Sequence, residues 1–231
     1  MLRSSLSPIA FLLVLLPATQ ASAHVSIASG PAFANSSGEV AFTVGHGCEM
    51  ADTYRVDVEI PAGVSSVRPE TSDFGEVNVM TDDAGIVVMV SWQKSESAIL
   101  PTDTQFYKLL VRLKAPDAPF TTLYFPAHQT CKAQDGTTTV VDWVGLDAAD
   151  GSEVEPAPSL RILPPRFPGW NKLTVPARVD ELGAFFGDAE IVWHGAAAFS
   201  INPTTVELIE QTDGVSLLSS IPAGGEIWVR Y

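Results

Sequence analysis

The chain has 231 residues, a net charge of −14 and a pI near 4.5, with 46% hydrophobic and 17% charged residues. This composition is typical of a globular protein with a substantial core and argues against an intrinsically disordered chain. The negative charge argues against binding to nucleic acid or to an anionic membrane surface, because both require clustered Lys and Arg. A cation is the natural small partner of such a chain.

The first segment, residues 1–23, has the pattern of a secretory signal peptide. Arg3 supplies the positive charge, residues 9–16 form an apolar run, and residues 21–23 (Ala-Ser-Ala) form a small-residue cleavage site. The apolar run is too short to cross a bilayer, and no later segment is long and apolar enough to do so. We therefore expect an exported protein, periplasmic or extracellular, whose mature chain begins at His24 and has no membrane span.

Several segments of the next region alternate polar and apolar residues or are rich in β-branched and aromatic residues, and Pro or Gly separates them. They cover residues 39–44, 54–60, 86–92, 107–113, 121–125, 137–143 and 160–163. About seven short strands with turns between them predict an antiparallel β-sandwich. We therefore expect an all-β fold of the immunoglobulin-like or cupredoxin-like kind over residues 24–162.

The composition changes near residue 150. Residues 147–158 (DAADGSEVEPAP) are acidic and small, which predicts a linker or long loop. We expect residues 163–231 to form a second, small β-rich domain. Its predicted elements are a short helix around residues 179–186 and strands at 190–193, 206–209 and 226–231. Three tryptophans are expected in its core, with an exposed aromatic platform as the alternative: Trp170, Trp193 and Trp228.

Cleavage after residue 23 would leave His24 with a free α-amine. The amine and the imidazole Nδ1 of one residue can chelate a metal ion, because an α-amine with a pKa of about 8 loses its proton to a metal at neutral pH. Nitrogen ligands favour Cu(II) over harder cations. The sequence therefore supports a Cu(II) site at His24. The alternative is a histidine that the signal peptidase leaves there by chance.

Two cysteines, Cys48 and Cys131, occur in this chain, and in an exported protein they predict one disulfide. The bond would hold the loop around Cys48 against the segment that contains His128. We keep His128 as a minor candidate ligand for this reason.

The loop around Cys48 offers two further donors, His46 and Glu49. A chelate from one residue leaves a Cu(II) site incomplete, so one of them could complete it. The alternatives are a hydrogen-bonded loop histidine for His46 and a solvated surface acid for Glu49.

Seven motifs occur in the order and with the gaps of a known family. They are HVS at 24–26, VGHGC at 44–48, VEIPAGV at 58–64, SVRP at 66–69, LYFP at 123–126, QTC at 129–131 and VDWVG at 141–145. Over about residues 24–150 the chain thereby resembles the YcnI-like copper-binding domain. The resemblance implies a β-sandwich in which the mature N-terminal histidine binds Cu(II), a carboxylate completes the site and a tryptophan lies beside the metal.

By this resemblance the three roles fall on His24, Glu49 and Trp143, with Asp52 as the alternative carboxylate. Without the resemblance, Trp143 would be taken for a core residue of the sandwich. We expect an exported copper chaperone or homeostasis protein rather than an enzyme, with another exported copper protein as its partner. One alternative is a copper-dependent oxidase of the lytic polysaccharide monooxygenase kind, which would need His46 or His128 as a second histidine ligand. The other is a structural or adhesive β-domain.

Overall fold

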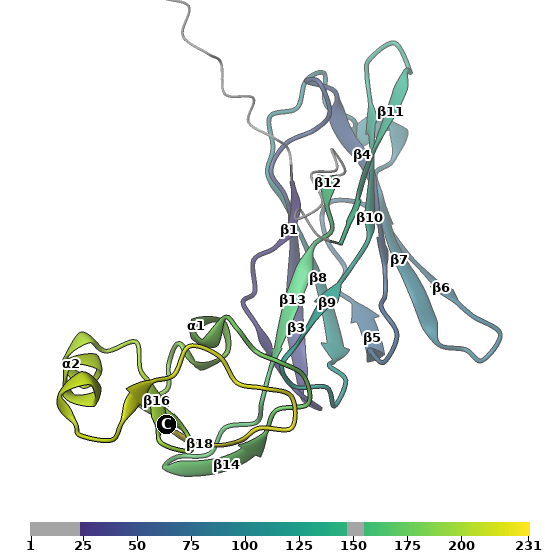
Figure 1. Cartoon of the computed structure of the whole chain (residues 1–231). Coiled ribbons are helices and arrows are strands. Elements are labelled where there is room, and N and C mark those ends of the chain that lie inside the picture. Colours follow the sequence, from purple (N-terminus) through teal and green to yellow (C-terminus); the bar gives the residue numbers. More distant parts are fainter. Residues whose placement is uncertain (1–23, 147–154) are drawn as a thin grey trace, which may run out of the picture.

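The computed structural model describes residues 24–146 and 155–231 (Figure 1). The predicted signal peptide and most of the predicted linker lie outside the described residues. Among the helices of the described residues, none is long and apolar enough to cross a membrane.

Residues 24–162, the first domain, are built from strands in three sheets. The four-stranded sheet has the order β1 (Val25–Ile27), β3 (Ser37–Val44), β8 (Tyr107–Lys114) and β5 (Ser65–Pro69). The six-stranded sheet has the order β12 (Glu155–Pro156), β11 (Thr138–Gly145), β10 (Ala127–Lys132), β4 (Asp52–Glu59), β7 (Val87–Gln93) and β6 (Glu76–Thr81). The third sheet has the order β2 (Ala32–Phe33), β13 (Ser159–Leu163) and β9 (Thr121–Tyr124). A short 3-10 turn, η1 (Glu96–Ala98), precedes β8. The predicted all-β fold is confirmed.

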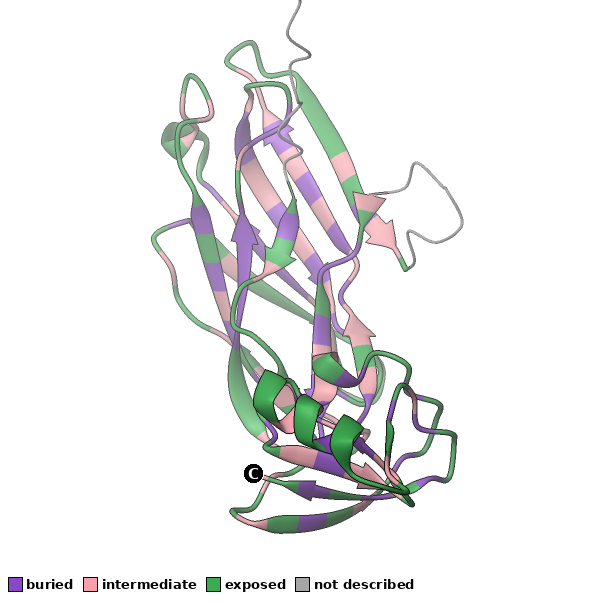
Figure 2. Cartoon of the chain, turned by 60° about the vertical axis from the view of Figure 1, so that its left-hand side comes forward, coloured by how far each residue is buried: buried purple, intermediate pink, exposed green. Residues whose placement is uncertain are grey.

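Alternation along the strands produces the core of the first domain. In β8, every second side chain is buried: Tyr107, Leu109, Val111 and Leu113. Because successive side chains of a strand point to opposite faces, this pattern turns one face of β8 inward. Figure 2 shows the same alternation of buried and exposed residues along the strands of the sandwich.

The predicted disulfide is present and links Cys48, just after β3, to Cys131 on β10 across 83 residues of sequence. The disulfide links the loop after β3, in the four-stranded sheet, to β10 in the six-stranded sheet. The two cysteine side chains are themselves buried, at 6% and 0% exposure.

The remaining residues, 164–231, contain one five-stranded sheet and two helices, and we call them the second domain. The sheet has the order β14 (Trp170–Thr174), β18 (Glu226–Arg230), β15 (Ile191–His194), β16 (Ala197–Phe199) and β17 (Ser216–Leu217). The helices are α1 (Leu182–Phe186), which is shorter than predicted, and α2 (Pro203–Gln211).

The predicted strand at residues 206–209 is wrong, because this segment lies inside α2. Asn202 caps the helix by accepting a hydrogen bond from the Thr204 amide, and Pro203 stands at its first position. Both residues favour a helix start. Of the apolar residues that favour a strand, Ile209 is buried and Val206 is partly buried, whereas Leu208 is 64% exposed. Most of this short helix is exposed (Figure 2).

The expectation that three tryptophans fill the core of the second domain is also wrong. Trp170 is 51% exposed, Trp228 is 48% exposed and Trp193 is only partly buried. The core instead contains aliphatic residues and Phe186: Val175, Val179, Leu182, Val192, Leu218, Ile221, Ile227 and Val229.

The second domain lies at the end of the sandwich opposite the β10–β11 turn (Figure 1). Phe120, from the connection between β8 and β9, joins the core of the second domain and packs 5.7 Å from the rings of Phe185 and Phe186. Arg161 on β13 donates a hydrogen bond to the Ala184 carbonyl. The first domain therefore supplies part of the second domain's core.

Candidate metal centre

His24 lies at one end of the β1–β3 ladder. Val25, the next residue, pairs with Val44 at the end of β3. The His24 side chain is 45% exposed, and its Nε2 atom lies 3.9 Å from Oε2 of Glu155. Its ring centre lies 5.2 Å from that of Trp143. The structure therefore brings the predicted histidine and the predicted tryptophan together.

Trp143 forms the buried side of this site. It lies on β11 and is 2% exposed, opposite Ala127 of β10 and Glu155 of β12. The small Ala127 side chain leaves room for the indole on the inner face of the sheet. Within the described residues, the Trp143 Nε1 atom is buried without a hydrogen-bond partner. A buried, unpaired donor is unusual, and this one belongs to a residue that contacts His24.

A carboxylate beside His24 belongs to Glu155, which is not among the ligands predicted from the sequence. The residue falls in the acidic stretch that was interpreted as a linker. It reaches the site because β12 pairs with β11 in parallel and places Glu155 opposite Trp143. A carboxylate shortly after the strand that contains Trp143 is the sequence feature that could have indicated Glu155. A strand of two residues is too short to show an alternating pattern, so the sequence does not reveal its parallel pairing with β11.

The predicted ligand Glu49 occupies a tight turn beside the disulfide. Its φ angle is 47°, and the Ala51 amide donates to the Cys48 carbonyl to close the turn. The Glu49 side chain is exposed. Its assignment as a ligand stays a prediction.

Asp52, the alternative carboxylate, is committed elsewhere. It is fully buried, and its Oδ2 atom lies 2.5 Å from the Nζ atom of Lys94. Its Oδ1 atom accepts a hydrogen bond of 2.7 Å from the Tyr107 hydroxyl, and the Leu100 amide donates to Oδ2. Burial and the neighbouring Asp52 raise the pKa of Tyr107. A carboxylate with these partners is part of the core, and we therefore reject Asp52 as a metal ligand.

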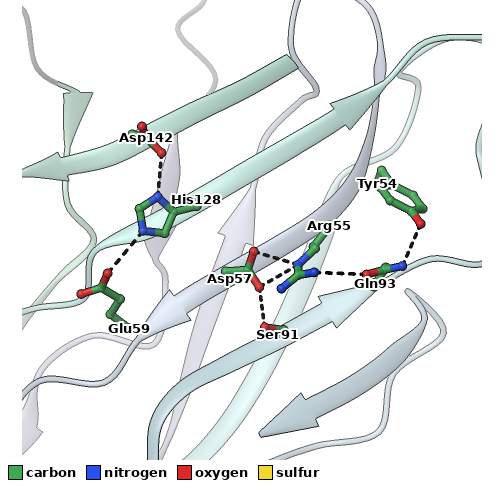
Figure 3. A network of polar contacts seen from close by, with 8 residues as sticks. All are labelled: Tyr54, Arg55, Asp57, Glu59, Ser91, Gln93, His128 and Asp142. Atoms are coloured by element: carbon green, nitrogen blue, oxygen red, sulfur yellow. Dashed lines mark hydrogen bonds and ion pairs between the residues drawn. The ribbon is translucent and has the colours of Figure 1, made fainter. Parts of the chain in front are cut away.

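His128 lies on the outer face of the six-stranded sheet (Figure 3). Its Nδ1 atom is 2.6 Å from Oδ1 of Asp142, and its Nε2 atom is 3.4 Å from Oε1 of Glu59. The hydrogen bond with Asp142, followed by that with Glu59, raises the pKa of His128. His128 pairs with Asp142 while the next pair in the ladder joins Ala127 to Trp143, so His128 and Trp143 point to opposite faces. His128 therefore does not join His24.

His46 lies just beyond Val44, at the same end of the ladder as His24. Its Nδ1 atom is 2.8 Å from the Gly47 carbonyl oxygen, and its own carbonyl accepts a hydrogen bond from Gln129. The side chain is half-buried. This environment agrees with a hydrogen-bonded loop histidine.

The residues around His24 fit a Cu(II) ion that takes one ligand from the main chain. Within the described residues, no group of three or more His, Cys, Asp or Glu side chains is placed to hold a metal. An imidazole and a carboxylate are present, and cleavage before His24 would add the amine as a third donor. Nitrogen and oxygen donors of this kind suit Cu(II).

Comparisons with known proteins identify the family of the first domain and support its fold. The family model described as "Domain of unknown function (DUF1775)" matches residues 24–162. A solved structure of an uncharacterized protein from Nocardia farcinica, reported to have an immunoglobulin-like fold, is 31% identical with a TM-score of 0.52. The match covers 61% of this chain and 99% of that one. A comparison with curated proteins finds no match.

Proposed function

The chain belongs to the DUF1775 family, the YcnI-like family, and on this premise we propose that it is an exported protein that binds Cu(II) at a mature N-terminal His24. The observation that supports the proposal is the contact of the His24 imidazole with both Trp143 and Glu155. A histidine beside a carboxylate and a buried tryptophan matches the ligand set that the family resemblance implies, with Glu155 in the place proposed for Glu49.

Each residue has a separate role in the proposed site. The amine and the Nδ1 atom of His24 chelate the ion, and Glu155 supplies a negatively charged oxygen. The His24 and Glu155 side chains are 45% and 41% exposed, which leaves both able to turn toward the ion once the amine is released. Trp143 excludes water from one side of the site. Because Cu(II) must displace protons from the amine and the imidazole, binding weakens as the pH falls.

The arrangement of histidines favours a carrier over an oxidase. A copper oxidase of the monooxygenase kind requires a second imidazole beside the N-terminal histidine. His128 points to the opposite face of the sheet and is held by Asp142 and Glu59. An oxidase site would therefore have to recruit His46, whose Nδ1 atom lies 2.8 Å from the Gly47 carbonyl oxygen. We therefore propose that the protein holds copper for delivery or homeostasis and does not catalyse a reaction.

Copper titration of the processed protein tests this proposal. The precursor is exported, and mass spectrometry verifies that the mature chain starts at His24. We expect one Cu(II) per chain and a type-2 electron paramagnetic resonance spectrum with nitrogen couplings. His24→Ala should abolish tight binding, and one extra residue before His24 should be as damaging because it removes the amine. Glu155→Gln should weaken binding at least tenfold, or about 1.4 kcal/mol.

Glu76→Gln is the matched control, because Glu76 is an exposed glutamate on β6, at the edge of the six-stranded sheet opposite β12. Its affinity should equal that of the unchanged protein. A verified mature chain that binds no copper would refute the proposal. Weaker binding in Glu49→Gln with normal binding in Glu155→Gln would return the carboxylate role to Glu49. Two imidazoles on the metal, together with oxidation of a polysaccharide in the presence of ascorbate, would favour the oxidase.

A further inference from the structure

Three tryptophans stand on one face of the second-domain sheet, and we call this surface the tryptophan face. Trp193 on β15 pairs directly with Trp228 on β18. Trp170 on β14 pairs with Arg230, two residues further along β18. Directly opposite residues and residues two apart in a strand point the same way, so the three indoles share a face. Together with Gly195 they line a shallow hollow of about 550 Å³.

Charged side chains alternate with the indoles on this face. Lys172 lies opposite Trp228, and Arg230 lies opposite Trp170. Each cation has an acidic partner: Lys172 Nζ is 2.7 Å from Glu226, and Arg230 Nε is 2.8 Å from Glu190. The face therefore offers hydrogen-bond donors and acceptors beside aromatic surface, with its positive and negative charges locally balanced.

The Gly-Trp-Asn sequence at the start of the domain holds Trp170 in place. The Asn171 side chain is buried, accepts a hydrogen bond from the Phe167 amide and donates to the carbonyls of Phe167 and Gly169. Gly169 has a φ of 88°, a conformation that favours glycine. The turn before β14 is thus fixed by a buried amide, while the Trp170 indole is left half exposed to solvent.

We propose that the tryptophan face binds a neutral, β-linked polysaccharide. A pyranose ring whose hydroxyls are equatorial has apolar C–H faces, which stack on indoles, and a polar edge, which hydrogen-bonds to Lys, Arg and Glu. The three indoles extend over roughly 12 Å, as estimated from the strand spacing and the rise along a strand. That length suits several linked sugar rings better than a single one.

The balanced charges argue against the other occupants of an exposed aromatic surface. A nucleic acid or an anionic membrane would need unpaired cations, whereas Lys172 and Arg230 are neutralised by carboxylates. The centre of a protein interface is depleted of charged residues, whereas this face alternates them with tryptophan. A sugar chain leaves the ion pairs in water while it covers the indoles.

Binding of cellohexaose and chitohexaose to the full mature protein, in the presence of EDTA, tests the proposal. We expect at least one of these β-linked hexasaccharides to bind, as measured by calorimetry and by a change in tryptophan fluorescence. Trp228→Ala and Trp170→Ala should each weaken binding at least tenfold, and Trp228→Phe should retain part of the affinity because it keeps an aromatic face. Melting temperatures within a few degrees of the unchanged protein should show that the variants fold.

Phe106→Ala is the matched control, because Phe106 is an aromatic residue of the first domain that is 64% exposed. It should bind the hexasaccharide normally, and so should His24→Ala, so failure of the copper proposal would leave this one standing. The proposal would be overturned if neither hexasaccharide binds. It would also be overturned if Trp228→Ala and Trp170→Ala both bind the sugar as tightly as the unchanged protein. Conversion of a dimer to a monomer by Trp228→Ala without sugar binding would overturn it in favour of a second copy. Binding to phosphatidylglycerol vesicles instead of sugar would overturn it in favour of a membrane surface.

Discussion

Trp143 in the first domain and Trp228 in the second both lie inside strands that have a neighbour on each side, yet one is 2% exposed and the other is 48% exposed. The difference in exposure arises because side chains along a strand point alternately to its two faces. Trp228 stands two residues from Glu226 and from Arg230, so it shares their solvent face. Trp143 directly follows Asp142, so it points to the opposite, inner face. A shift of one residue exchanges the two faces of a strand, and the charged neighbours reveal which face a tryptophan occupies.

The two domains also differ in how their interiors are held together. The first domain contains the disulfide and the buried Lys94–Asp52–Tyr107 cluster. The core of the second domain is aliphatic and aromatic and includes Phe120 from its neighbour. The first domain therefore adds a covalent bond and a buried charged cluster to its apolar core, whereas the second domain relies on apolar contacts alone.

Lys94→Met should produce the largest effect. Lys94 is 5% exposed and its removal would leave Asp52 buried without its cation. Breaking one partner of a buried pair costs about 3–5 kcal/mol of unfolding free energy. Urea unfolding followed by circular dichroism measures the loss.

Lys132→Met is the control for that variant. Lys132 pairs with Glu96, whose side chain is 66% exposed, and such pairs contribute about 0–1 kcal/mol. Equal losses in the two variants would contradict the view that the buried cluster anchors the first domain.

Phe120→Ala should have the next largest effect and tests the contrast from the other side. Phe120 is 7% exposed and contacts Phe185 and Phe186, so its truncation leaves a cavity that costs about 3–5 kcal/mol. Calorimetry should show the loss in the unfolding of the second domain. Phe106→Ala, at an exposed site, should change little. An unaltered second-domain transition in Phe120→Ala would mean that this domain completes its core alone.

The parts of the fold that follow local patterns could be predicted from the sequence. The strands with clear alternation, such as β8, and the disulfide both appear as expected. Helix α2 differs from the predicted strand at 206–209 because its start is set by Asn202 and Pro203, a signal that the apolar pattern at 206–209 does not contain. The local sequence pattern is sufficient to predict a structural feature that depends on a single strand or on a single pair of cysteines.

The site depended on contacts that the sequence does not display. The predicted pair of His24 and Trp143 is present, and this prediction came from the family resemblance rather than from periodicity. Glu155 reaches His24 through a two-residue parallel pairing of β12 with β11, which joins segments that have no shared pattern. The exclusion of Asp52 required the positions of Lys94 and Tyr107, which are distant in sequence.

The smallest expected effect concerns the outer face of the six-stranded sheet, where ion pairs join polar side chains (Figure 3). The corresponding exposed face of the second domain presents tryptophans instead. Asp142 and then Glu59 raise the pKa of His128 above its unfolded value of about 6.5. The protonated form is therefore favoured in the folded state, and its stabilisation is complete below about pH 6.5 and is lost as the pH rises through the folded pKa. His128→Gln should lower the free energy of unfolding, measured with urea, at pH 5.5 but not at pH 8.5. The loss should be less than about 1 kcal/mol because the partner carboxylates are largely exposed to solvent. If His128→Gln lowers the free energy of unfolding equally at both pH values, His128 acts through packing. The difference between the two outer faces would then not depend on the charge of His128.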